Sequence, residues 1–167
     1  MAVFEWMAAH GPPRNGATPH GARPVLAHPR GPSPTTGVCP HDDPLPRYDQ
    51  NRYAPGGYAP SLSMDTTGML YTPSSCAAGA PCKLVVARHG CLSGQYLLGD
   101  AFPELGNLDT YADTDNLVVL HPQAISSVLP VNPEGCWDWW GYDGSNFAVR
   151  SAPQMTAIVN MVHALGG

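Results

Sequence analysis

Two apolar runs separated by helical spacing constrain the fold of this chain more than any other feature. Residues 83–88 contain four consecutive apolar side chains, and residues 117–120 are apolar throughout. Runs without polar alternation are typical of strands buried on both faces of a parallel sheet. Between them, residues 95–102 and 108–113 have apolar side chains at helical spacing. This order predicts an α/β fold with a mostly parallel sheet and flanking helices.

A short strand and a longer helix are expected on either side of this unit. Residues 69–72 predict the strand. At the C-terminal end, Ser151 and Gln154 match a capping-box pair and Pro153 falls in the first helical turn. One apolar stripe follows, made of Met155, Ile158, Val159, Val162 and Leu165. The pattern predicts a helix that packs on the sheet, with its methionines in the core.

The first part of the chain has no such pattern. Ten of the 19 prolines fall in residues 1–46, without helical or strand periodicity. We therefore expect residues 1–46 to be disordered and residues 47–167 to form the folded domain. The apolar residues of 1–7 are interrupted by Glu5 and are too few for a secretory leader, so no signal peptide is expected.

Composition excludes several classes of partner. The net charge is -5, and the eight Lys and Arg residues form no cluster, which argues against a nucleic-acid surface. No apolar stretch approaches the roughly 20 residues of a membrane helix. We expect no membrane partner, no cofactor and no specific protein partner.

Four of the five cysteines lie in the predicted folded domain. Cys76 and Cys82 bracket a turn-forming Ala-Ala-Gly-Ala-Pro segment, and their spacing exceeds that of a zinc knuckle. A local disulfide is therefore favoured over a metal site. Cys91 and Cys136 would close a longer second bridge. Two disulfides imply an oxidising compartment, which conflicts with the missing leader. Either the natural protein starts elsewhere or the cysteines are reduced, and the first explanation is favoured.

The segment Arg88-His89-Gly90-Cys91 is the first candidate for chemistry. It directly follows a predicted buried strand, where a glycine-containing turn exposes backbone N–H groups toward the ligand crevice of α/β proteins. Such groups build an oxyanion hole. The alternative is a tight turn that only requires glycine, with His89 hydrogen-bonded in the core.

The second candidate is an aromatic segment in residues 132–142. Trp137, Trp139, Trp140 and Tyr142 fall within six residues that are flanked by glycines. Tryptophans in a loop can line a groove for a chain of ester or sugar units. Alternatively, one or two of them close the core, and we expect a division of labour with one or two on the surface.

Four segments resemble, in order and approximate spacing, the C-terminal part of polyhydroxybutyrate depolymerases: residues 84–91, 111–124, 132–142 and 151–155. The resemblance implies a circularly permuted α/β-hydrolase, extracellular, acting on a polyester or its oligomers. It implies that Cys91 supplies an oxyanion N–H from a loop shared with His89 and Gly90. It also implies that Trp137, Trp139 and Trp140 contribute to the substrate crevice, whereas Arg88 departs from the apolar residue usual in the family.

No Ser-His-Asp triad is expected in this chain. No G-x-S-x-G elbow is present, and Ser93 lies in the predicted oxyanion loop. His89 and His121 do not match the family's catalytic base. The acidic residues Asp113, Asp115 and Asp138 are expected to bond locally. We therefore expect a truncated or frameshifted product that is inactive alone.

Two other functions fit the same residues. A feruloyl or acetylxylan esterase shares loops of the His-Gly-Cys type, although the Gly-Cys-Trp-Asp-Trp-Trp run favours a polyester. A small disulfide-bonded module could also adsorb to polymer through exposed tryptophans without cleaving it.

Overall fold

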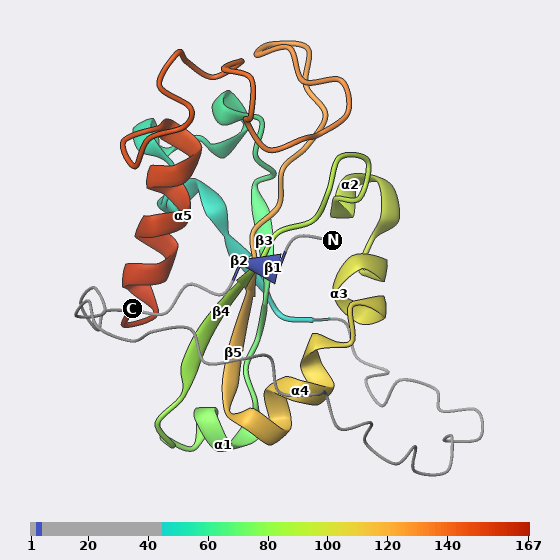
Figure 1. Ribbon diagram of the computed structural model, residues 1–167, viewed down its shortest axis with the longest axis vertical. Coiled ribbons are helices and arrows are strands. Elements are labelled where there is room, and N and C mark those ends of the chain that lie inside the picture. The colour runs from blue at the N-terminus through green and yellow to red at the C-terminus, as the bar shows by residue number, and fades with distance from the viewer. Residues whose placement is uncertain (1–2, 5–44) are drawn as a thin grey trace, which may run out of the picture.

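The computed structural model describes residues 3–4 and 45–167, which are arranged around a five-stranded sheet (Figure 1). The strand order is β1-β4-β5-β3-β2. The strands are β1 (Val3–Phe4), β2 (Arg47–Asp49), β3 (Thr67–Tyr71), β4 (Lys83–Ala87) and β5 (Leu117–His121). The three strands predicted from the sequence are all present.

The sheet is mixed, so the prediction of a mostly parallel sheet is wrong. Among the described strands, only β4 and β5 pair in parallel, whereas the other three pairs are antiparallel. The reason is the length of the connections. Residues 72–82 between β3 and β4 are too few for a crossover and reverse the chain, while residues 88–116 are long enough to carry it back to the start of β5.

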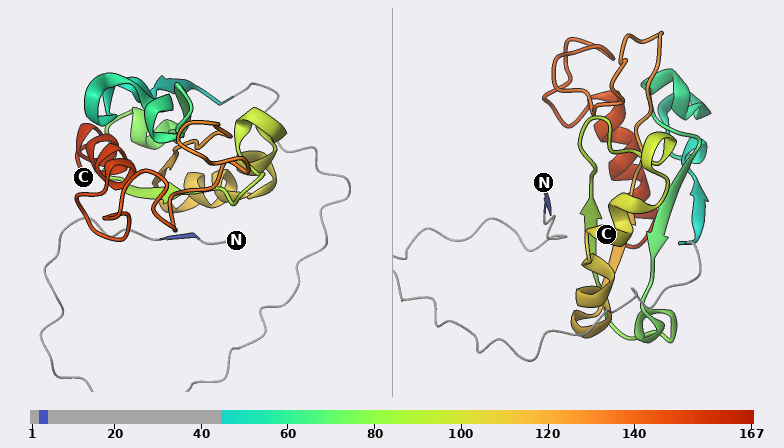
Figure 2. Two further views of the ribbon diagram at one scale, coloured as in Figure 1. Left: turned by 90° about the horizontal axis from the view of Figure 1, so that it is seen from above. Right: turned by 90° about the vertical axis from the view of Figure 1, so that its right-hand side faces the viewer.

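Helices cover both faces of the sheet (Figures 1 and 2), as predicted. The α-helices are α1 (Ser74–Ala77), α2 (Gln95–Leu98), α3 (Ala101–Leu105), α4 (Leu108–Asp115) and α5 (Pro153–Ala164). Three short 3-10 helices precede β3, namely η1 (Gln50–Arg52), η2 (Pro55–Gly57) and η3 (Ala59–Leu62). The predicted helix at residues 95–102 is divided in two, because Gly99 adopts φ 57° and ends α2.

Alternating residues of the parallel strands face two separate clusters. Val86 and Leu120 pack with α5, whereas Ala87 and Val119 pack with Ala112 of α4. Since side chains alternate along a strand, these two clusters lie on opposite faces. The parallel pair is therefore covered on both sides, as its apolar sequence predicts.

Helix α5 starts differently from the prediction. Pro153 is in the first turn as expected, but the N-cap is Ala152 and no side chain caps the helix. The predicted capping box of Ser151 and Gln154 is wrong, because Gln154 turns inward and is 5% exposed. Met161 is buried as predicted, whereas Met155 lies at the edge of the stripe and is 36% exposed.

Most of the segment predicted to be disordered, residues 1–46, lies outside the described residues, and so does Cys39. Of the described residues in this segment, Val3–Phe4 form β1 and pair with β4. Leu45 is buried in the cluster that contains Ala112 of α4. Both predicted disulfides are present: Cys76 is bonded to Cys82 across the α1 turn, and Cys91 to Cys136. No helix among the described residues is long and apolar enough to cross a bilayer.

His121 at the end of β5 is a buried polar side chain that makes no hydrogen bond within the described residues. It is fully buried, pairs in register with Met69, and its ring lies edge-on to Phe102 at 6.2 Å. Within the described part of the chain, neither ring nitrogen has a hydrogen-bond partner. Burial lowers the pKa of His121 to about 4.

We predict that this histidine makes the fold acid-sensitive. The unfolded chain protonates His121 at the ordinary pKa of about 6.5. Its contribution to the free energy of unfolding is therefore complete above pH 6.5 and is lost as the pH falls toward 4. The shift corresponds to about 3 kcal/mol. Between pH 6.5 and 4.5, the free energy of unfolding measured in urea should fall less for His121→Leu than for the unsubstituted chain. In the control His163→Leu, at an exposed position, the free energy of unfolding should depend on pH as in the unsubstituted chain. An equal pH dependence in all three proteins would contradict the prediction.

Candidate functional site

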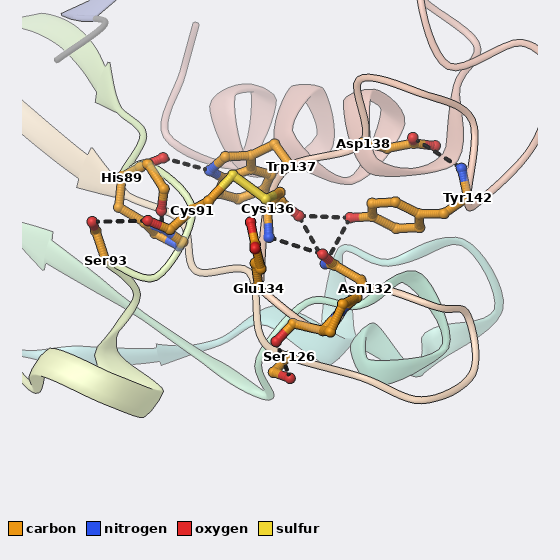
Figure 3. Close-up of a disulfide and its surroundings, with 12 residues drawn as sticks. His89, Cys91, Ser93, Ser126, Asn132, Glu134, Cys136, Trp137, Asp138 and Tyr142 are labelled. Carbon is orange, nitrogen blue, oxygen red and sulfur yellow. Dashed lines mark hydrogen bonds between the residues drawn. A yellow bond between two sulfur atoms is a disulfide. The ribbon is translucent and has the colours of Figure 1, made fainter.

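The two loops that leave the carboxyl ends of β4 and β5 are tied together at the top of the sheet (Figures 1 and 3). The Cys91–Cys136 disulfide joins them, with the two Cα atoms 4.2 Å apart. In addition, the Leu92 N–H and the Tyr96 hydroxyl donate to the Glu134 carbonyl at 2.8 and 3.0 Å. The sequence candidates on these two loops therefore form one site.

The ring of His89 is held in one tautomer by the backbone. The Ala124 N–H donates to Nε2 at 3.0 Å, so Nε2 is an acceptor without a proton. In the neutral ring the proton then lies on Nδ1, which donates to the Gly90 carbonyl at 2.7 Å. Burial is the main cause that lowers the pKa of His89, and the charge of Arg88 lowers it further. His89 is therefore a neutral structural ring.

The bond from His89 also sets the direction of the next N–H group. The Gly90–Cys91 peptide is trans, so its C=O and N–H point in opposite directions. With the Gly90 carbonyl turned toward His89, the Cys91 N–H points away from it. Among the described residues, no hydrogen bond uses this N–H, and Cys91 is exposed. The loop thus presents one oriented, free backbone donor.

Trp137 packs against the loop at residues 88–91. It is 8% exposed, and its Nε1 donates to the His89 carbonyl at 3.1 Å. Its ring lies 5.5 Å from the His89 ring, and the Arg88 guanidinium stacks over it at 4.5 Å. The charge at the end of β4 thus makes a cation–π contact, while its Nε is buried without a hydrogen-bond partner among the described residues.

Trp139 and Trp140 lie on the surface instead. They are 68% and 42% exposed, and their rings meet edge to face at 5.1 Å. Both line an open groove of about 310 Å³ whose other walls are Cys91, Pro133, Glu134 and Cys136. The expected division of labour is observed, with one tryptophan buried and two exposed.

Three polar side chains hold the tryptophan loop, residues 132–142, in place. Sequence analysis gave Asn132 no role, assigned Gln154 to a capping box and expected Asp138 to bond locally. Asn132 is fully buried; its Oδ1 accepts from the Cys136 N–H and its Nδ2 donates to the Cys136 carbonyl and the Tyr142 hydroxyl. Gln154 accepts from the Asp138 N–H and donates to the Leu62 carbonyl.

The third of these anchors is Asp138. Its carboxylate accepts the N–H groups of Gly141, Tyr142 and Asp143, as expected for a locally bonded residue. For Asn132 the available signal was weak, since an Asn before Pro is common in ordinary turns.

The described residues do not assemble a catalytic triad. In this part of the chain, no serine hydroxyl is hydrogen-bonded to a histidine ring. The Ser93 hydroxyl donates to the Cys91 carbonyl at 3.2 Å, and Asp113 accepts from the Tyr71 hydroxyl. Cys91, Glu134 and Cys136 are close enough to hold a metal ion, but both sulfurs are in the disulfide and are not available as thiolate ligands.

Comparison with known proteins shows which proteins this chain is similar to. No protein-family model matches the chain. A polyhydroxybutyrate depolymerase of Talaromyces funiculosus is 44% identical over 121 residues, which cover 66% of this chain and 35% of that protein. This chain is similar to part of a polyhydroxybutyrate depolymerase. A poly(3-hydroxybutyrate) depolymerase of Delftia acidovorans is 42% identical over 101 residues, covering 59% of this chain and 20% of its relative.

Solved depolymerase structures have the same fold. The crystal structure of the PHB depolymerase from Penicillium funiculosum superposes with a TM-score of 0.62 and 39% identity. A PHB depolymerase complexed with an R3HB trimer gives a TM-score of 0.64 and 40% identity. Each comparison covers 71% of this chain and 39% of the solved chain. The chain therefore spans between a fifth and two fifths of the depolymerases that it matches.

We predict that Asn132→Ala destabilises the tryptophan loop. The substitution leaves the N–H and C=O of buried Cys136 without their Asn132 partners, which should cost about 3 kcal/mol. Chemical unfolding measures this loss, and the near-ultraviolet circular dichroism of the tryptophans should change with it. Asn146→Ala, at an exposed position, is the matched control and should leave both signals unchanged. Equal stability of the two variants would contradict the role of Asn132.

The tautomer of His89 is a separate prediction. Long-range 1H–15N NMR at pH 7 should show a neutral ring with the proton on Nδ1 and an unprotonated Nε2. A proton on Nε2, or a charged ring at pH 7, would contradict the bonding that orients the Cys91 N–H.

Proposed function

We propose that this chain supplies the oxyanion loop and the substrate groove of a serine esterase that hydrolyses poly(hydroxyalkanoate) esters. The observation that carries the proposal is the free N–H of Cys91, oriented by His89 at the edge of a groove that two exposed tryptophans line. The similarity to polyhydroxybutyrate depolymerases at about 40% identity supports the choice of reaction.

In this reaction a serine attacks the ester carbonyl, and negative charge develops on the carbonyl oxygen. The Cys91 N–H donates to that oxygen, while a second donor follows the nucleophile in hydrolases of this type. Losing one such donor typically costs about 2.7–4 kcal/mol of transition-state stabilisation. Gly90 and His89 contribute by holding the peptide that carries the donor. The residues assigned to this chain thus act by electrostatic stabilisation and binding.

The groove suits an uncharged polyester. Trp139 and Trp140 present apolar rings against which the methyl and methylene groups of a hydroxyalkanoate chain can pack. One similar structure is complexed with an R3HB trimer, which supports an oligoester as ligand. The two disulfides favour an oxidising, extracellular setting.

A polymer-binding module is the second candidate, favoured by the exposed tryptophans and by the lack of an assembled triad among the described residues. Such a module would adsorb to granules but release no hydroxybutyrate. The carbohydrate esterase alternative predicts binding to feruloylated or acetylated xylan instead.

We predict that Trp139→Ala weakens adsorption of the chain to polyhydroxybutyrate granules by about tenfold, because the removed ring is a large exposed contact. Its free energy of unfolding should change little. Leu105→Ala, which removes another exposed apolar side chain on α3, is the control and should adsorb normally. Undiminished adsorption of Trp139→Ala would reject the groove as the binding site. Serine-dependent release of hydroxybutyrate by this chain alone would contradict the assignment of loop and groove only.

A further inference from the structure

A carboxylate lies in the wall of the proposed substrate groove. Glu134 is exposed and lines the groove together with Trp139 and Trp140. One of its carboxylate oxygens lies within 4.8 Å of the sulfur atoms of Cys91 and Cys136 (Figure 3). The residue that carries the free oxyanion donor is therefore next to a negative charge.

The backbone of Glu134 is fixed, while its charge is not neutralised. The carbonyl accepts from the Leu92 N–H and the Tyr96 hydroxyl. Among the described residues, the carboxylate accepts no hydrogen bond, and the one ion pair joins Arg47 to Asp100. The guanidinium of Arg88 is stacked on Trp137 and lines a different, small cavity. A ligand in the groove therefore meets an uncompensated negative charge.

This charge distinguishes the parts of a polyester chain. Internal segments carry only neutral ester groups, whereas one end carries an ionised carboxylate. Two like charges about 6 Å apart repel each other enough to weaken binding about threefold at the dielectric constant of water, and more between low-dielectric walls. The repulsion is greatest at low ionic strength.

We propose that Glu134 is a specificity-determining residue that excludes carboxylate ends from the groove and favours uncharged internal segments. This inference rests on the proposed function of the groove. It also applies to the product side of the reaction. Hydrolysis adds water across the ester, leaving a hydroxyl on one fragment and a carboxylic acid on the other, which loses its proton near neutral pH. A new carboxylate formed beside Glu134 is repelled, so the same charge assists product release.

The test compares two ligands, one with the terminal charge and one in which a methyl ester removes it. Isothermal titration calorimetry in low-salt buffer at pH 7.5 gives the Kd of the R3HB trimer as free acid and as methyl ester. The unsubstituted chain should bind the methyl ester at least threefold more tightly. Glu134→Gln should bind both equally, mainly through a gain for the free acid. Asp115→Asn removes one exposed charge at the end of α4, just before the start of β5 and so away from the groove, and should keep the preference.

Each outcome has a distinct meaning. An undiminished preference in Glu134→Gln, or no preference in the unsubstituted chain, overturns the role of Glu134 and leaves the groove assignment intact. Loss of the preference in Asp115→Asn also overturns it, because net charge would then explain the effect. Failure of both ligands to bind any of the proteins overturns the proposed function of the groove, and this inference with it.

Discussion

The hydrogen bond from the Ala124 N–H to the His89 ring is the interaction on which the site depends. It connects the carboxyl ends of β4 and β5, the one parallel strand pair among the described residues. Because Nε2 must accept this bond, the remaining ring nitrogen is available only as a donor to the Gly90 carbonyl. The orientation of the Cys91 peptide therefore follows from the parallel register of two strands and one histidine.

Around this bond, the site is built almost entirely from loops. Two buried amide side chains and a half-buried carboxylate replace the backbone hydrogen bonds that a helix or strand would have supplied. Asn132, Asp138 and Gln154 perform this role, and the disulfide adds a covalent link. With its backbone groups satisfied from inside, the loop can direct two tryptophan rings outward. An exposed aromatic surface is thus compatible with a rigid support.

Local sequence patterns predicted the elements well and their arrangement less well. The strands at residues 83–87 and 117–121 contain continuous apolar runs, and the helices between them have apolar side chains at helical spacing. Both signals depend on neighbouring residues only. The antiparallel position of β3 and the inward turn of Gln154 depend on contacts across the fold, such as that between Gln154 and Leu62. No local pattern encodes them.

For the site, the motif at residues 88–91 indicated a backbone donor, but the tautomer of His89 required the position of Ala124, which comes 35 residues later. Glu134 was visible as a residue of the tryptophan segment, yet its proximity to Cys91 follows only from the folded loops.

The Cys91–Cys136 bond spans a sequence separation of 45 residues, within which lie α2, α3, α4 and β5. A covalent closure of this kind makes the intervening segment topologically a ring. Inside such a ring, the distance between the two loops is limited by a covalent bond as well as by the packing of the helices between them. Local loosening of α3 or α4 therefore leaves the two loops joined.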